Sequence, residues 1–154
     1  MTSSMEQLYQ EIILDHYKHP HGRGLREPFE AEAHHVNPTC GDEVTLQVDV
    51  SGDGQVEAVR WEGQGCSISQ ASVSVLHDLV VGQDLATVDR LAGTFRALMQ
   101  SKGAGLDDEE AEDALGDANA FTGVGKFSAR VKCALLGWTA LNDALIKSGA
   151  REDA

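Results

Sequence analysis

Three cysteines and one aspartate are the residues of this chain best suited to hold a metal ion. The cysteines of the sequence are Cys40, Cys66 and Cys133, and Asp42 follows the first of them by two positions. Three thiolates and a carboxylate supply four ligands, the number that a closed tetrahedral zinc site or a small iron–sulfur cluster requires. Because an odd number of cysteines cannot all pair within one chain, metal binding or thiol chemistry explains them better than a disulfide framework.

The positions of these residues favour a shared site but leave another explanation open. Residues two apart on an extended segment point the same way, so Cys40 and Asp42 can reach one ion, with Gly41 letting the backbone bend between them. Cys66 and Cys133 are expected near helix starts, flanking turns rather than lying deep within apolar stripes, where the helix dipole favours a thiolate. The sequence has no Cys-x-x-Cys pair, and any one of these thiols taken singly fits equally well as a small apolar core residue.

The neighbours of the cysteines include candidates for a supporting role. Four anionic ligands around a divalent ion leave a net charge of about −2, which needs neutralising groups nearby. Arg130 and Lys132 are the basic residues nearest the third cysteine, and we assign the supporting role to Arg130, with an ordinary solvated helix position as the alternative. His34 and His35 precede the first cysteine, but surface histidines in a loop explain them better than ligands do. The other histidines have no ligand spacing to a cysteine and are left out of the site: His16, His19, His21 and His77.

Helices and strands that must position these residues follow from the hydrophobic pattern. Apolar residues at helical spacing predict a helix over about 4–17 and a second one to about residue 81 that begins after Cys66, where Ser67 and Gln70 have capping-box spacing. Two more helices are expected, one capped by Asp84 and ending near residue 101, and one starting at Ser128.

Alternating apolar residues predict two strands joined by a turn. Val44, Leu46, Val48 and Val50 alternate with polar residues over 44–50, the turn signal Ser-Gly-Asp-Gly follows, and a second strand is expected over about 56–61. The acidic stretch 106–116 is only weakly amphipathic and predicts a short exposed helix to which no role is assigned.

Composition limits the classes of partner and compartment. The 25 acidic residues outnumber the 12 basic ones, and the formal net charge of −13 argues against nucleic acid or an anionic membrane and favours a basic or neutral protein. Every apolar run is far shorter than the roughly 20 residues that cross a bilayer, and the first residues lack the features of a secretory signal. We therefore expect a cytoplasmic protein with one domain over 1–154.

With these residues in view, the chain resembles the SufU branch of the IscU/NifU-type iron–sulfur assembly family. The resemblance runs from Leu8 to about Ile146 and rests on the following segments: Leu8-Tyr9, Asp15-His16-Tyr17, Pro20, Asn37-Pro38-Thr39-Cys40-Gly41-Asp42, Gly63-Gln64-Gly65-Cys66-Ser67-Ile68-Ser69 and Arg130-Val131-Lys132-Cys133. IscU-type members carry a histidine immediately before the third cysteine, where this chain has Lys132. They also have a Pro-Pro-Val-Lys segment before it, where this chain reads Lys126-Phe127-Ser128-Ala129-Arg130.

The resemblance implies an α+β fold in which a three-stranded antiparallel sheet is packed by helices, as in the SufE and NifU/IscU-like proteins. It further implies a zinc-dependent sulfurtransferase whose ligands are Cys40, Asp42, Cys66 and Cys133. Cys40 is the implied acceptor of persulfide sulfur from a PLP-dependent cysteine desulfurase of the SufS type, for delivery to the SUF assembly proteins. Two alternatives stay open: a scaffold that builds a [2Fe-2S] cluster on the same residues, and an acidic binding module with a purely structural zinc.

Overall fold

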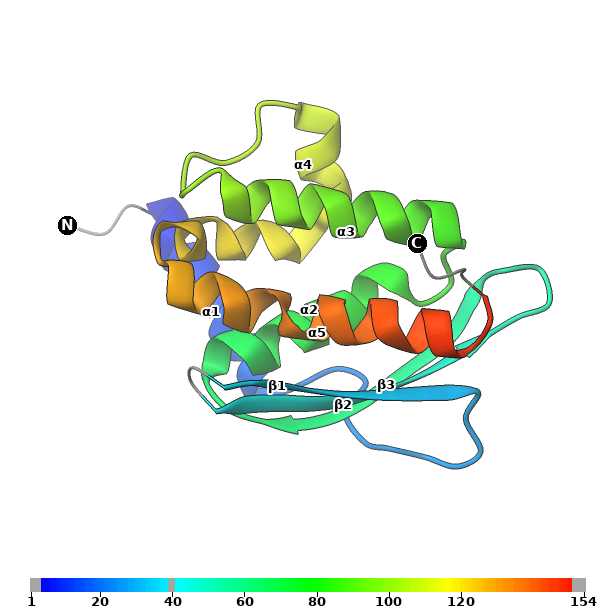
Figure 1. Ribbon diagram of the computed structural model, residues 1–154. Coiled ribbons are helices and arrows are strands. Elements are labelled where there is room, and N and C mark those ends of the chain that lie inside the picture. The colour runs from blue at the N-terminus through cyan, green and yellow to red at the C-terminus, as the bar shows by residue number, and fades with distance from the viewer. Residues whose placement is uncertain (1–3, 39–40, 151–154) are drawn as a thin grey trace.

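The computed structural model describes residues 4–38 and 41–150, which form an α+β fold with one antiparallel sheet, as expected (Figure 1). The sheet has the strand order β1 (Ala31–Asn37), β2 (Asp42–Val50), β3 (Val56–Gln64). The helical elements are α1 (Ser4–Lys18), α2 (Ser67–Val80), α3 (Leu85–Gln100), α4 (Glu109–Leu115), the 3-10 helix η1 (Gly116–Lys126) and α5 (Ser128–Lys147). No helix of these described ranges combines the length and apolar character needed to cross a membrane.

The helices gather on one face of the sheet, with α2 and α5 nearest to it and α3 farther out (Figure 1). The apolar positions that alternate along β2 and β3, including Leu46 and Trp61, are fully buried beneath these helices. Above them Phe95 of α3 stacks on Trp138 of α5 at 5.6 Å between ring centroids and meets Phe121 of η1 edge to face. Burial of these aromatic rings fixes the outer helices on the inner pair.

One close contact between α2 and α5 depends on a small residue. A Cβ atom placed on Gly137 of α5 would lie 2.7 Å from Cγ2 of Val73 in α2, so this position has no room for a side chain. Beside it the Ser72 hydroxyl of α2 donates a hydrogen bond to the Ala134 carbonyl at 2.6 Å. These contacts hold α5 in register against α2, and thus bring Cys133 toward the start of α2.

Local sequence signals gave most element boundaries within a few residues. The Asp84 carboxylate accepts a hydrogen bond from the Thr87 amide at 2.8 Å and caps α3, as expected. The capping box at the start of α2 was wrong, because the N-cap is Cys66 and its side chain makes no capping bond. In the acidic stretch 106–116 the helix is limited to α4, which Asp108 caps by accepting from two backbone amides.

The hydrophobic pattern did not predict two of the elements, β1 and η1. Strand β1 contains His34 and His35, which were expected in a surface loop. It pairs along its whole length with β2, in a register that sets Asn37 opposite Asp42. The 3-10 helix η1 was not expected either, because its small residues show no clear helical period. Both elements are defined by their partners, β2 for the strand and α1, α3 and α5 for the 3-10 helix.

Candidate metal centre

The β2–β3 ladder brings Asp42 next to Cys66. Asp42 begins β2, its neighbour Glu43 pairs with Gln64 at the end of β3, and the chain then passes through Gly65 into Cys66. The Asp42 Oδ1 atom accepts a hydrogen bond from the backbone N–H of Cys66 at 2.9 Å. Since Asp42 is only 1% exposed, sheet pairing and this bond fix its carboxylate at the start of α2.

The close approach of Asp42 to the turn requires a glycine at position 65. Gly65 has φ +144°, in the region that favours glycine, and a Cβ on it would lie 2.1 Å from Asp42 Oδ1. Any side chain there would displace the carboxylate or the turn. In the Gly65-Cys66 pair, the glycine is therefore required for steric reasons and the cysteine is a candidate ligand.

Helix α5 supplies the third donor. Cys133 lies in the second turn of α5 and is 3% exposed. The buried side chain of Asn37, at the end of β1, places its Nδ2 donor 3.7 Å from the Cys133 sulfur. Asp42, Cys66 and Cys133 each offer one ligand atom, and these atoms all lie within 4.8 Å of one another. The structure thus joins three of the four residues expected to share a metal ion.

The separation of two of these donors suits a tetrahedral ion. Asp42 Oδ2 and Cys66 Sγ are 3.5 Å apart. In a tetrahedral zinc site with Zn–S near 2.3 Å and Zn–O near 2.1 Å, a sulfur and an oxygen ligand stand about 3.6 Å apart. A donor set of two sulfurs and one carboxylate oxygen fits zinc, and thiolates fit an iron–sulfur cluster as well. The geometry supports a metal site without choosing between the two.

Two expected members of the site are not brought into it by the described contacts. Cys40 lies outside the described residues, so its place at the site stays a prediction; Gly41, which follows it, has the positive φ of +75° that a bend requires. Arg130 is exposed in the first turn of α5, three residues before Cys133, and its supporting role stays a prediction too.

The histidines nearest the first cysteine bind other groups. His34 of β1 is 2.7 Å from the Thr45 hydroxyl, across the strand pair. His35 is 3.1 Å from Asp143 Oδ2 of α5, and its hydrogen bond holds the pKa of Asp143 below the usual value. These contacts join β1 to its neighbours, which agrees with leaving both residues out of the ligand set.

Sequence reasoning placed Cys133 wrongly in one respect and overlooked Asn37. Cys133 was expected to flank a helix start outside the apolar stripes, but it belongs to the buried core. Asn37 stands three residues before Cys40, in the segment 37–42 that carries part of the family resemblance. Its amide nevertheless faces the sulfur of Cys133, 96 residues away in sequence. Only strand pairing and the packing of α5 reveal that contact.

A groove is lined by two residues that are close in sequence to members of the metal-ligand cluster. It has a volume of about 570 Å³ and lies between the start of α1, η1 and the start of α5. Its lining includes Ile68, two residues after Cys66, and Arg130, three before Cys133. Met5 and Phe127, also in the lining, are 55% and 57% exposed. The groove is therefore accessible and partly apolar, although none of the three cluster residues lines it.

Comparison with known proteins gives one consistent result. The family model of the NifU-like N-terminal domain matches residues 8–150. The zinc-dependent sulfurtransferase SufU of Bacillus subtilis is 39% identical over 149 residues, which are 95% of both chains. The scaffold protein IscU of Streptococcus pyogenes serotype M1 is 36% identical, over 95% of this chain and 87% of its own.

A solved structure agrees with these sequence relatives. It is the crystal structure of a protein from Fervidobacterium islandicum AW-1 proposed to be an iron–sulfur cluster assembly scaffold for the SUF system. It superposes with a TM-score of 0.71 at 32% identity, covering 93% of this chain and 99% of that one.

Proposed function

The chain belongs to the NifU-like N-terminal domain family, and from that premise we propose that it relays sulfur from a cysteine desulfurase into iron–sulfur cluster assembly. The observation that carries the proposal is the convergence of Asp42, Cys66 and Cys133 within 4.8 Å, beside a chain segment that holds Cys40 two positions before Asp42. In the proposal all four residues hold zinc, and the domain extends over 1–154.

The proposed role of zinc is to keep Cys40 deprotonated while shielding it from unwanted reactions. Transfer would require Cys40 to be free of the ligand set, and in the family resembled a histidine of the desulfurase would serve as the substitute ligand. The Cys40 thiolate then attacks the outer sulfur of the desulfurase persulfide. A new S–S bond forms on Cys40, the S–S bond of the donor breaks, and the donor cysteine leaves as a thiolate, so no external oxidant is needed.

Residues around the cluster support this chemistry. The Asp42 carboxylate stays oriented by the Cys66 amide, and the Asn37 amide is placed to stabilise negative charge on the Cys133 sulfur. Arg130 offsets part of the anionic charge in the proposal. In the proposal the groove between α1, η1 and α5, with exposed Phe127, gives the PLP-dependent desulfurase, of the SufS type, a partly apolar surface to contact. The net charge of −13 suits a basic partner and disfavours nucleic acid.

The decisive variant is Cys40→Ala, which we expect to abolish stimulation of the desulfurase because the acceptor sulfur is gone. The measurement is alanine and sulfide release by the desulfurase with each purified protein present. Thr39→Ala, a change at the adjacent position that removes no thiolate, is the control and should stimulate normally. Normal stimulation by Cys40→Ala would exclude the relay.

A [2Fe-2S] scaffold is the second candidate, because relatives that include the Streptococcus pyogenes protein are named iron–sulfur cluster assembly scaffold proteins. Elemental analysis separates the two functions. Stoichiometric zinc in protein prepared without added metal supports sulfur relay. A visible iron–sulfur chromophore that passes to an apo-acceptor protein supports the scaffold. Lys132, where IscU-type members have histidine, favours the relay.

A further inference from the structure

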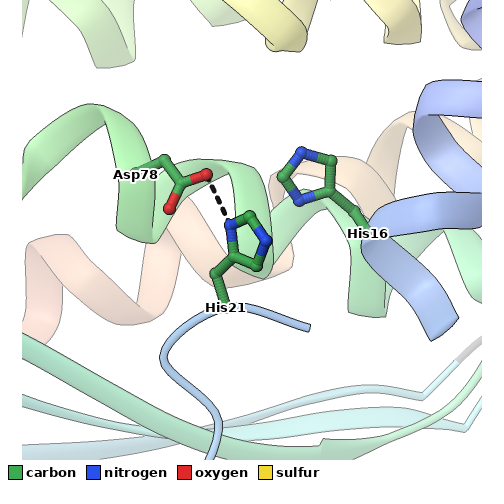
Figure 2. A group of neighbouring side chains, drawn as sticks. All are labelled: His16, His21 and Asp78. Carbon is green, nitrogen blue, oxygen red and sulfur yellow. Dashed lines mark hydrogen bonds and ion pairs between the residues drawn. The ribbon is translucent and has the colours of Figure 1, made fainter. Parts of the chain in front are cut away.

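A second group of potential ligands lies at the other end of α2. It consists of His16 from α1, His21 from the segment that follows α1, and Asp78 from α2 (Figure 2). One ligand atom from each residue lies within 4.8 Å of the others. Asp78 is twelve residues after Cys66, a distance of about 18 Å along a helix, so the two groups share no ligand.

His16 is held in a fixed orientation by two polar partners. The residue is 3% exposed, with Nε2 at 3.0 Å from Asp117 Oδ2 and Nδ1 at 2.7 Å from the Ser74 hydroxyl. The Ser74 oxygen already accepts a hydrogen bond from the backbone N–H of His21 at 2.8 Å. If Ser74 donates its own proton to Nδ1, Nε2–H donates to Asp117, and the lone pair of His16 lies on Nδ1. A carboxylate behind one imidazole nitrogen is the usual support for a histidine that ligates metal through the other.

His21 and Asp78 form the open side of the group. Their side chains are 45% and 44% exposed, and His21 Nδ1 is 2.6 Å from Asp78 Oδ2. The imidazole rings of His16 and His21 lie 4.8 Å apart between centroids, tilted by 56°, and the other nitrogen of His21 faces His16 in Figure 2. Because both exposed side chains can rotate, modest movements bring the donors to the spacing of a coordination shell.

We propose that His16, His21 and Asp78 bind a first-row divalent transition cation, with Zn²⁺ as the type ligand. Two imidazole nitrogens and one carboxylate oxygen suit zinc, nickel, copper or iron better than magnesium or calcium, which prefer oxygen alone. Three protein ligands leave a position for water. In the bound form the cation takes the place of the Ser74 proton on Nδ1, Asp117 keeps His16 oriented, and α1 is linked directly to α2.

The electrostatic setting favours a cation at this place. Asp78 lies in the last turn of α2, and the C-terminal end of a helix carries a partial negative charge. Asp117 adds a further carboxylate from η1, and His77, the other titratable group of that turn, directs its Nδ1 to the Val59 carbonyl at 3.0 Å. The site is thus negative and oxygen- and nitrogen-rich, whereas the centre at Cys66 offers sulfur.

The test uses the untagged full-length protein, because a histidine tag binds the same ions. After one equivalent of Zn²⁺ per chain has been added, Co²⁺ is titrated and followed by its visible d–d absorption and by dialysis. We expect a further equivalent to bind without a sulfur-to-cobalt charge-transfer band. His21→Ala and Asp78→Asn should each weaken this binding at least tenfold, and His19→Ala, an exposed neighbour outside the group, should not.

Two results would overturn the proposal. One is a Co²⁺ affinity of His21→Ala and Asp78→Asn equal to that of wild type. The other is a second equivalent whose spectrum shows thiolate ligation. Circular dichroism of each variant checks that it is folded, and both replaced side chains are exposed enough for folding to persist. The Co²⁺ titration can be interpreted even if the sulfur-relay proposal fails, because an absorption spectrum from nitrogen and oxygen ligands does not involve the cysteines.

Discussion

The two ends of α2 each gather three potential metal ligands, but the groups differ in chemistry, burial and support. At the start of the helix, Asp42 and Cys133 are buried, and Asp42 accepts a backbone hydrogen bond. At the other end only His16 is buried, while His21 and Asp78 are nearly half exposed and contact each other. The first group is held ready for an ion, and the second must rearrange to bind one, which predicts tighter binding at the first.

The helix itself reinforces the contrast. The N-terminal end of α2 carries a partial positive charge that stabilises thiolates and carboxylates, whereas the C-terminal end carries a partial negative charge that stabilises cations. In the two proposals, metal binding at the first centre would therefore depend on anionic ligands gathered by the fold, and metal binding at the second on the negative potential of the helix end. Perturbing each end separately tests whether the two behave independently.

The largest effect is expected from Gly65→Ala, which should lower zinc affinity at the first centre by disturbing the packing around Asp42. The new Cβ would lie 2.1 Å from Asp42 Oδ1 and displace the carboxylate, so zinc affinity should fall by about 10- to 100-fold. Competition with a chromophoric chelator measures the affinity. Gly82→Ala is the matched control, because Gly82 also has positive φ, +87°, but its Cβ would meet nothing within 4 Å. Equal zinc affinity in the two variants would contradict the assignment of Asp42 as a ligand.

A medium effect is expected from Ser74→Ala, which removes the hydroxyl that contacts His16 Nδ1 in the second group. Loss of the hydroxyl leaves His16 Nδ1 buried without its partner and should lower the free energy of unfolding by about 1–3 kcal/mol. Urea denaturation measures the change. Zinc affinity at the cysteine centre should stay as in wild type.

Thr94→Ala is the control for Ser74→Ala, since the partly exposed Thr94 hydroxyl only donates an intrahelical bond to the Arg90 carbonyl. Its free energy of unfolding should change by no more than about 0.5 kcal/mol. A comparable loss in both variants would mean that the His16 network adds nothing specific to the joint between α1 and α2.

The smallest effect concerns an ion pair that belongs to neither group. Burial raises the pKa of Asp49, but hydrogen bonds from the Arg60 side chain and the Glu30 amide outweigh it and hold the pKa below 3.8. Because the folded pKa is the lower one, the ionised pair stabilises the protein above about pH 3.8, and this contribution is lost as the pH falls through the lowered value.

Asp49→Asn should therefore be less stable than wild type near neutral pH by roughly 0.5 kcal/mol, with the difference shrinking below pH 3.8. Thermal unfolding at a series of pH values measures it. A difference that grows on acidification would contradict the sign of the shift. Metal affinity at both ends of α2 should be unaffected.

Much of the fold followed from local signals. Asp84 as a cap, the Ser51–Gly54 turn and the apolar alternation along β2 each act within a few residues, so the chain reveals them directly. Strand β1 did not, because His34 and His35 interrupt its alternation, and its stability comes from pairing with β2 and packing under α5. The burial of Cys133 was also missed, because it results from the packing of α5 in the folded protein and not from a local pattern.

The amino-acid sequence by itself determined which residues could ligate zinc or iron, since residue type alone decides that Cys66, Cys133 and Asp42 offer thiolates and a carboxylate. It also determined the family, through short motifs that remain visible without a structure. Only the tertiary structure decided which donors meet. Asp42 reaches Cys66 across a strand ladder, and His16 reaches His21 and Asp78 through the packing of α1 on α2. Such contacts depend on long-range pairing, which spacing along the chain does not encode.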